Sequence, residues 1–380
     1  MARKFVWREK VAVHEKEVCG CPPILGNDVS GLGCCVVIPS LFPSNHHTVL
    51  VMQRLPATMK ENIRRVVLAG GSGFLGRALA GHFLDVGWDV VILTRSPNPK
   101  GDGIREAQWD GCTIAPWRQE LDGAIAVVNL SGKSVNCRYN SANRKEILES
   151  RVNATRVVGE AIGQCANPPP VWLNASTATV YKHTFGNPWD ESGEIEAASE
   201  AKDAFSVEVA QAWEGALDKP DTPRTRKVAM RMGMVVGLDK NSVFPVLRRL
   251  VRLGLGGKMG SGGQYVSWMH IIDYCRAVEW LISHDNLRGP VNVVAPNPVP
   301  NREMMRILRR VCGAPFGLPA AEWMLEIGAF LMSTETELIL KSRRVIPGRL
   351  LESGFQFQFP TLEEAFRDLS GAGSNVPSRR

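Results

Sequence analysis

From residue 64 onward, short runs of β-branched residues alternate with longer stretches whose apolar positions recur with a helical period. The short runs are typical of buried strands, and the longer stretches are typical of helices with one apolar face. Strands that alternate with helices imply βαβ crossovers and a parallel sheet covered on both faces. The predicted strands are 64–70, 89–95, 124–132, 171–177 and 226–237, and the predicted helices are 77–87, 143–166 and 203–217.

After residue 240 the alternation loosens. A glycine-rich loop over 253–264 precedes the segment 267–282, which leads into a helix. A strand over 291–296 and a helix over 301–313 follow, the helix capped by Asn301 and ended by Gly313. The rest of the chain to residue 370 is expected to be helical apart from the stretch GFQFQFP, whose alternation predicts a short edge strand.

The bulk composition is that of an ordinary globular protein. The 380 residues are 44% hydrophobic and 22% charged, and no run of eighteen apolar residues could cross a bilayer, so we expect a soluble protein. The formal net charge of +7 comes from scattered Lys and Arg residues without a basic stripe interleaved with aromatic residues. We therefore expect a small anionic ligand, and neither nucleic acid nor membrane as a partner.

Residues 1–58 differ in character from the rest. They contain CGC, CC and three histidines, but the spacing matches no paired CxxC pattern, so we expect no metal site. No apolar core precedes a small-residue cleavage site, as a signal peptide would require. We expect a disordered extension, or an upstream start codon with Met59 beginning the functional chain. The odd count of nine cysteines argues against a disulfide framework and favours the cytoplasm.

The stretch LAGGSGFLGRAL places Gly70, Gly73 and Gly76 between a predicted strand and a predicted helix. A tight turn, a close approach of backbone to a pyrophosphate and helix–strand packing each require a residue without Cβ. The free N–H groups at the start of the helix, around Phe74 and Leu75, would face the phosphate oxygens. This order of elements favours a dinucleotide site over glycines that only permit a turn.

The second predicted strand ends at Thr94 and Arg95. An NAD site usually has Asp or Glu there to accept a hydrogen bond from the ribose 2′-hydroxyl, and this chain has neither. A guanidinium group matches a 2′-phosphate, with charge-assisted hydrogen bonds of roughly 1.5–3 kcal/mol each. We therefore predict NADP(H) in preference to NAD(H). The alternative is a solvated arginine at the strand end.

Over about residues 62–372 the chain resembles the extended short-chain dehydrogenase/reductase superfamily, and more narrowly its atypical NAD(P)-dependent epimerase-like family, some members of which are called SulA-like cell-division inhibitors. The resemblance rests on LAGGSGFLGRAL, VVNLSGKSV, RKEILESRVNATR, MRMGMVVG, LGLGGKMGSGGQYVSWMHIIDYCRA, GPVNVVAPNPVPNREM and RRVIPGRLLESGFQF. It implies an α/β fold, a Rossmann-type doubly wound parallel sheet with a smaller C-terminal lobe on the substrate side.

The resemblance also implies a division of the chain. Residues 59–240 would form the NADP-binding Rossmann domain, completed by about 265–300. Residues 241–264 and 301–372 would form the substrate-side lobe, and 373–380 a disordered tail.

Further cofactor contacts follow from the same resemblance. Leu130 and Ser131 would lie against the adenosine ribose and the pyrophosphate, with ordinary strand-end packing as the alternative. Glu146 and Arg151, on the helix 143–166, would face the cofactor, with a solvated helix surface as the alternative.

Chemistry in the superfamily uses a Ser or Thr that holds the substrate oxygen and a YxxxK pair one helix later, whose tyrosine is the acid and base. The stretch ASTATVY resembles the SSATVY motif of UDP-galactose 4-epimerase, which places Thr177 at the catalytic hydroxyl and Ser176 beside it. In the following helix, Phe205 stands where the tyrosine belongs and Val209 where the lysine belongs. Neither side chain can move a proton or bind a ribose.

Other side chains are candidates for the missing role. Tyr181 is the nearest titratable group, and Glu208 lies on the helix beside the absent lysine. The loop 253–264 is expected to close over the ligand, its glycines allowing motion. Packing residues, a structural His–Asp contact and a solvated loop are the alternatives. The residues expected on the substrate side are Gln264, Trp268, His270 and Asp273.

Two hypotheses follow. The first is an NADP-dependent oxidoreductase or epimerase-like enzyme acting on a small hydroxylated, carbonyl or sugar-like substrate, with hydride transfer at nicotinamide C4 while Thr177 polarises the oxygen. The second is a non-catalytic NADPH-binding regulator or sensor that acts through a protein partner, motivated by Phe205 and Val209. The superfamily likeness favours the enzyme.

Overall fold

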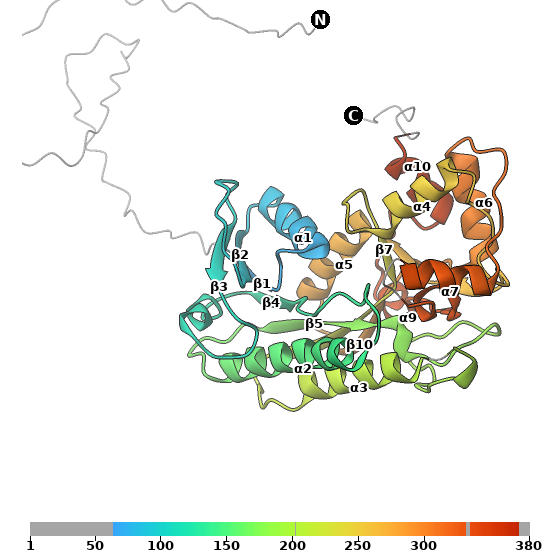
Figure 1. The fold of residues 1–380 in the computed structure, drawn as a ribbon. Helices are drawn as coiled ribbons and strands as arrows, with labels where there is room; N and C mark the ends of the chain where they lie inside the picture. The colour runs from blue at the N-terminus through green and yellow to red at the C-terminus, as the bar shows by residue number, and fades with distance from the viewer. Residues whose placement is uncertain (1–63, 202, 332–334, 372–380) are drawn as a thin grey trace, which may run out of the picture. The chain divides into compact units, whose positions relative to one another are not determined.

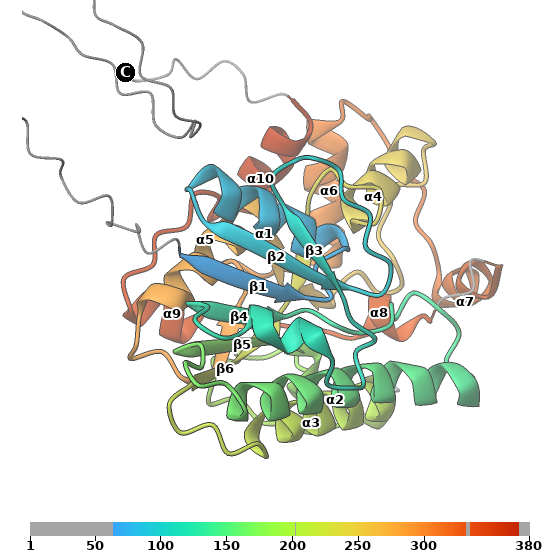
Figure 2. The same ribbon diagram turned by 90° about the vertical axis from the view of Figure 1, so that its left-hand side faces the viewer.

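The computed structural model describes residues 64–201, 203–331 and 335–371, and the predictions for residues 1–58 and 373–380 lie outside these ranges. A seven-stranded sheet lies at the centre, in the order β10-β6-β5-β4-β1-β2-β3, with every neighbouring pair parallel (Figure 2). This confirms the predicted doubly wound α/β fold. The strands are β1 (Arg65–Ala69), β2 (Asp89–Thr94), β3 (Arg105–Gln108), β4 (Ala126–Asn129), β5 (Val171–Thr177), β6 (Arg226–Met232) and β10 (Gly289–Val293).

Helices cover both faces of the sheet, α1 (Phe74–Asp85) and α5 (Ile271–Ser283) on one and α2 (Ser141–Gly163) and α3 (Ala204–Asp218) on the other (Figure 1). The alternation of side chains along each strand produces this division. In β1, Val66 and Leu68 belong to the core beneath α1 and α5, and Val67 and Ala69 belong to the core against α2. The unbroken apolar run at residues 66–69 therefore belongs to a strand, β1, that is buried on both faces.

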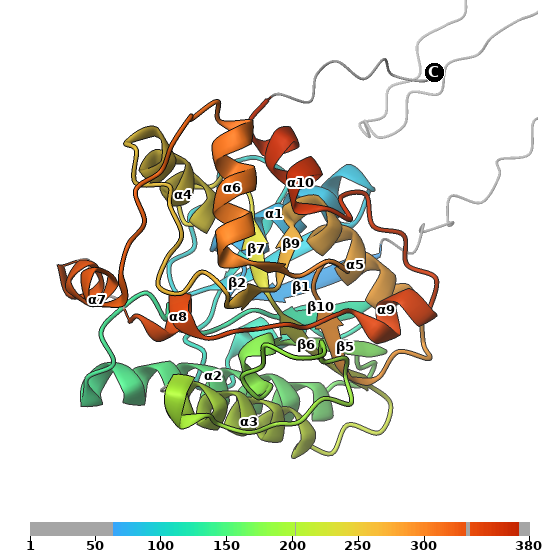
Figure 3. The same cartoon turned by 90° about the vertical axis from the view of Figure 1, so that its right-hand side faces the viewer.

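A third hydrophobic core lies outside the sheet and is built by elements from the C-terminal part of the chain (Figure 3). Phe244, Trp268 and Phe366 are fully buried in it. The elements beyond the central sheet are α4 (Val243–Arg252), α6 (Asn301–Val311), α7 (Glu322–Leu331), α8 (Glu337–Leu340), α9 (Gly348–Glu352), α10 (Leu362–Leu369) and two strand pairs, β7 (Met234–Val236) with β9 (Trp268–His270) and β8 (Tyr265–Val266) with β11 (Val299–Pro300).

Two predicted strands were wrong in detail. The run 226–237 is interrupted at Gly233, where a Cβ would lie 2.6 Å from the Ser267 carbonyl oxygen, so β6 and β7 are separate. The stretch GFQFQFP forms no strand, because the N–H groups of Gln358 and Phe359 donate to the carboxylate of Asp273 at 2.8 Å and not to a neighbouring strand. Its alternating phenylalanines reflect burial of Phe355 and Phe359 in two different cores.

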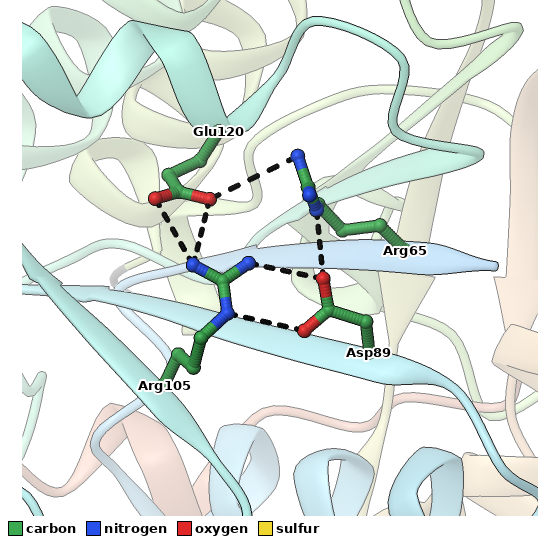
Figure 4. A network of polar contacts seen from close by, with 4 residues as sticks. All are labelled: Arg65, Asp89, Arg105 and Glu120. Carbon is green, nitrogen blue, oxygen red and sulfur yellow. Dashed lines mark hydrogen bonds and ion pairs between the residues drawn. The ribbon is translucent and has the colours of Figure 1, made fainter. Parts of the chain in front are cut away.

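An ion-pair network ties together the amino ends of β1, β2 and β3 (Figure 4). Asp89 Oδ2 accepts from Arg65 Nε at 2.8 Å, and Arg105 donates to both carboxylate oxygens of Asp89 and to Glu120. Burial alone would raise the pKa of Asp89, but its hydrogen bonds from Arg105 and Arg65 lower it. The carboxyl ends of the strands, at the opposite edge, are left for a ligand.

Among the described residues, none of the helices has the length and apolar character needed to cross a membrane. No group of three or more potential metal ligands occurs in the same part of the chain. Its five cysteines are all free thiols.

Candidate active site

A cavity of roughly 460 Å³ opens at the carboxyl ends of β1, β4, β5 and β6. It lies where the strand order reverses, between β1 and β4, which is the usual ligand site of a doubly wound sheet. The predicted residues that line it are Gly70, Gly73, Phe74, Leu75, Gly76, Leu130, Ser131, Arg151, Ser176 and Thr177.

The glycine turn at one end of the cavity has little room for side chains. Gly70 has φ +71°, and a Cβ there would lie 2.6 Å from Ser131 Oγ. A Cβ on Gly76 would lie 2.3 Å from the Cα of Gly71, so the first turn of α1 can pack on the loop only as glycine. The backbone of the glycine turn can therefore come close to a ligand in the cavity, because no side chain lies between them.

The start of α1 forms a hydrogen-bonding cradle of backbone N–H groups. Gly73 is its N-cap, no side chain caps the helix, and no acidic residue lies in the first turn. Opposite it, Ser131 Oγ is buried without a hydrogen-bond partner among the described residues. Free N–H groups, the positive end of the helix dipole and an unused hydroxyl together fit the pyrophosphate of a dinucleotide.

The carboxyl end of β2 lies outside the cavity lining. Thr94 is buried, and its carbonyl oxygen accepts from Trp109 N at 2.9 Å. Arg95 follows it, exposed, and forms no hydrogen bond or ion pair with any residue in the described ranges. Its guanidinium group is free of protein partners there, and its contact with a 2′-phosphate stays a prediction.

Arg151 contributes positive charge to the cavity wall. Its Nη1 donates to the Ile147 carbonyl oxygen at 2.9 Å, and its guanidinium carbon lies 5.0 Å from the centroid of the Trp213 ring. Burial lowers the pKa of Arg151 to about 10, so the group is still protonated at neutral pH. Glu146, on the same helix, is exposed, pairs with Lys133 and does not line the cavity.

The two hydroxyl groups at the end of β5 have different environments. Ser176 Oγ donates to Glu214 Oε1 at 2.6 Å, and Arg231 holds the same carboxylate through two hydrogen bonds. Because an ionised carboxylate only accepts, the Ser176 proton is committed, and Ser176 can only accept from a ligand. Thr177 Oγ1 accepts from Thr179 N at 3.2 Å and donates to Thr179 Oγ1 at 3.1 Å. It lines the cavity and has no acidic partner among the described residues.

Phe205 and Val209 line the cavity on α3, where the superfamily likeness placed the absent tyrosine and lysine. The Phe205 ring meets the Tyr139 ring edge-on, with centroids 5.2 Å apart, and the Arg144 guanidinium carbon lies 4.7 Å from its centroid. This side of the cavity is therefore an apolar wall with a phenol next to it.

Comparison with known proteins settles the family. A sequence model of the NAD dependent epimerase/dehydratase family matches residues 66–294, more than half of the chain. The chain belongs to the NAD-dependent epimerase/dehydratase family. A second model, a domain of unknown function (DUF1731), matches residues 320–369, which lie in the C-terminal part.

Relatives within the family match nearly over their whole length. The epimerase family protein YfhF of Bacillus subtilis is 30% identical over 305 residues, which cover 80% of this chain and 97% of the relative. The chloroplastic homolog of epimerase family protein SDR39U1 from Arabidopsis thaliana is 28% identical over 353 residues, covering 91% of this chain and 98% of the relative. The crystal structure of human SDR39U1 (isoform 2) with NADPH matches with a TM-score of 0.70 and 28% identity, over 82% of this chain and 100% of that one.

Family membership does not make Tyr181 the acid. Its ring is 2% exposed and lies outside the cavity lining. Its hydroxyl donates to Asn292 Oδ1 at 2.8 Å and accepts from Arg231 Nη1 at 2.9 Å, and burial raises its pKa. The structure thus contradicts the prediction that Tyr181 takes the role of the absent tyrosine, because Tyr181 is a core residue. Glu208 is exposed on α3 and does not line the cavity either.

The predicted substrate-side residues are buried and do not line the cavity. His270 caps α5 by accepting from Ile272 N at 3.2 Å, and its Nε2 lies 3.3 Å from Asp368 Oδ2. Asp273 accepts from two backbone N–H groups and from Arg276 Nη1 at 2.8 Å. These two predictions were therefore wrong about position, because the neighbours of both residues are structural.

Gln264 and Trp268 were misplaced for the same reason. Gln264 is 2% exposed and donates to the carbonyl oxygens of Met259 and Ile339. Trp268 is fully buried, with Nε1 donating to Asn297 O at 3.0 Å. The loop 253–264 is fixed by hydrogen bonds to residues 318 and 320, so it lines its own core and not the cavity.

Sequence reasoning missed a polar cluster beside the cavity. Tyr139, Thr179 and Ser206 line the cavity, and Glu337 and Arg343 approach them from the segment after residue 335. No local pattern marks these residues, because the contacts that bring them together join four separate segments of the chain.

Proposed function

We propose that this chain is an NADP(H)-dependent oxidoreductase or epimerase-like enzyme of the extended short-chain dehydrogenase/reductase type, acting on a small hydroxyl, carbonyl or sugar-like substrate. One observation carries the proposal: a single cavity joins the anion cradle at the start of α1 to the hydroxyl of Thr177 at the end of β5. A dinucleotide laid along it would present one end to the substrate beside Thr177.

The cofactor assignment is supported by the chemistry of the donors. The N–H groups of α1 and the unpartnered Ser131 hydroxyl would hold the pyrophosphate, and Arg95 the 2′-phosphate. No carboxylate follows β2 to bind a ribose 2′-hydroxyl, and the human relative was solved with NADPH. When bound, this cofactor supplies or accepts the hydride.

The two hydroxyls at the end of β5 take different roles in the proposal. Thr177 donates to the substrate oxygen and polarises it. Ser176, whose proton is held by Glu214, accepts from an N–H or O–H of the ligand. Glu214 and Arg231 fix this arrangement from outside the cavity.

The apolar wall formed by Phe205 and Val209 favours a second candidate, a regulator that binds NADPH and acts through a protein partner. Nothing in that wall opposes cofactor binding, so both candidates bind NADPH, and they differ in turnover of a substrate and in the need for a protein partner. We favour the enzyme, with a small molecule as partner, because the Thr177 hydroxyl is retained within the cavity. We propose the cytoplasm as its compartment, in keeping with the free cysteines of the described residues.

Stopped-flow absorbance at 340 nm with NADPH and a panel of ketones, aldehydes and nucleotide-sugar carbonyls tests the proposal. Wild type should oxidise NADPH with one class of compound, and Thr177→Val should lose that rate while binding NADPH as before. Thr184→Val is the matched control, because it removes a threonine hydroxyl from a residue that does not line the cavity. If the protein binds NADPH but no compound in the panel causes NADPH oxidation, the result would contradict the enzyme hypothesis and favour the regulator.

A further inference from the structure

Tyr139 lies in the loop before α2 and lines the same cavity as Thr177. Its ring contacts the ring of Phe205 edge-on, with an interplanar angle of 70°. The phenol is therefore a direct neighbour of Phe205, which stands at the position of the absent tyrosine. Its backbone N–H donates to Glu335 Oε1 at 2.7 Å, which ties the loop to the C-terminal segment. The cavity wall thus retains a phenol, supplied by a different element.

The phenol is half-buried among polar side chains. Ser206, in the first turn of α3, also lines the cavity. Glu337 is 7% exposed, and its Oε1 is buried without a hydrogen-bond partner among the described residues. Burial raises the pKa of Glu337.

The C-terminal segment also reaches the candidate hydroxyl. Arg343 Nε donates to Thr179 Oγ1 at 3.0 Å, and Thr179 Oγ1 lies 3.1 Å from Thr177 Oγ1. The segment 335–345 therefore contacts Thr179, beside Thr177, through Arg343, and it contacts the backbone of Tyr139 through Glu335.

The charged groups that face the phenol are Glu337, Arg151 and Arg343. Burial, and after it the charge of Glu337, raise the pKa of Tyr139 to about 12, against the opposing effects of Ser206 and Arg151. The phenol is thus protonated at neutral pH and available as a donor.

We propose that Tyr139 is the proton donor and acceptor of the reaction. The inference rests on the proposed function. A bound reduced nicotinamide would supply the hydride to the carbonyl carbon. The C=O π electrons would then move to the carbonyl oxygen, which would take the proton of Tyr139 Oη. The phenolate would regain a proton from solvent through the cavity, and the products would be an alcohol and NADP⁺.

Tyrosine NMR tests the position of the phenol without turnover. The chain has four tyrosines, so Tyr139→Phe assigns one signal in protein labelled with ¹³C at tyrosine Cζ. That signal should shift on addition of NADP⁺ but not of adenosine 2′,5′-bisphosphate, which lacks the nicotinamide. An unmoved Tyr139 signal at saturating NADP⁺ would overturn the inference and leave cofactor binding intact. Failure of both nucleotides to bind would remove the proposed function together with it.

Kinetics test the chemistry. Tyr139→Phe should lower kcat by roughly 10²–10⁴ with NADPH affinity unchanged, as expected for loss of a general acid. The control Tyr265→Phe removes a phenol outside the cavity lining and should change nothing. Turnover by Tyr139→Phe at the wild-type rate would overturn the inference while the proposed function stands.

Discussion

Ser176 Oγ lies 2.6 Å from Glu214 Oε1, a hydrogen bond that joins the floor of the cavity to a nearly buried ion pair with Arg231. The guanidinium group holds both carboxylate oxygens, at 2.9 and 2.8 Å. Hydrogen bonding and charge from Glu214 raise the pKa of Arg231, outweighing the opposing effect of burial. The pair therefore commits the Ser176 proton to a carboxylate, whereas the Thr177 hydroxyl donates to the hydroxyl of Thr179.

Glu214→Gln should destabilise the protein, because it leaves the Arg231 charge without its partner. We expect a loss of about 3–5 kcal/mol in the free energy of unfolding, as for other broken buried pairs. Urea denaturation measures it, with Glu279→Gln, which weakens a more exposed pair with His82, as control. Equal losses in the two variants would contradict the structural role given to Glu214.

Gly73→Ala should weaken NADPH binding without weakening the fold. Its φ is −81°, and an added Cβ meets no protein atom within 4 Å, so only a ligand would be obstructed. Gly81→Ala, in the same helix with the same open surroundings, is the control and should leave affinity unchanged. Calorimetric titration and thermal unfolding separate the two effects. Unaltered NADPH affinity in Gly73→Ala would place the pyrophosphate elsewhere.

Gly76→Ala should disrupt the fold itself. Its Cβ would lie 2.3 Å from the Cα of Gly71, a contact with backbone that no rotamer can relieve. The expected result is a lowered Tm together with lost NADPH binding. A Tm equal to that of wild type would show that the turn is looser than this packing.

Arg95→Ala should lower the affinity for NADPH and leave that for NADH unchanged. Loss of a charge-assisted bond of roughly 1.5–3 kcal/mol corresponds to about 10- to 100-fold in Kd. Titration calorimetry with both cofactors measures the ratio, and NADH serves as the internal control. Equal affinity of the wild-type protein for NADPH and NADH would contradict the NADP(H) assignment.

Stability should fall on mild acidification, with a contribution from His270. Burial lowers the pKa of His270, against the opposing charges of Asp368 and Asp273, so the folded state binds fewer protons than the unfolded state. This contribution is present above the unfolded pKa of about 6.5 and is lost as pH falls below it, by up to about 1.4 kcal/mol per pH unit. Urea denaturation between pH 7.5 and about 5.5 measures the slope.

His270→Asn is the informative variant for that slope. Asparagine can cap α5 as His270 Nδ1 does, but it does not titrate. The variant should therefore show a shallower loss of stability on acidification than wild type. An identical slope would assign the pH dependence to other groups, such as His183, whose pKa burial also lowers.

The glycine turn and the parallel sheet covered on both faces could be predicted from the sequence because local rules encode them. Gly70 needs a positive φ, and the β-branched runs need burial on both faces, and each signal lies within a few adjacent residues. The absence of the YxxxK pair was visible for the same reason, since Phe205 and Val209 lie at fixed spacing on one helix.

The substrate end of the site could not be predicted in this way. His270 and Asp273 follow a strand end, as site residues often do, but Asp368 and the backbone at Gln358 and Phe359 hold them in the interior. Those partners lie far along the chain and leave no local pattern. Tyr139 was missed for a similar reason, because Phe205 and Glu335, which hold it at the cavity, come from other elements.

A crystal structure with NADP⁺ tests the central claim most directly, that one cavity holds the dinucleotide with its reactive end beside Thr177. We predict the pyrophosphate against the N–H groups at the start of α1, and nicotinamide C4 facing the substrate space between Thr177 Oγ1 and Tyr139 Oη. A nicotinamide ring directed away from both hydroxyls, or a cofactor bound outside this cavity, would contradict the account.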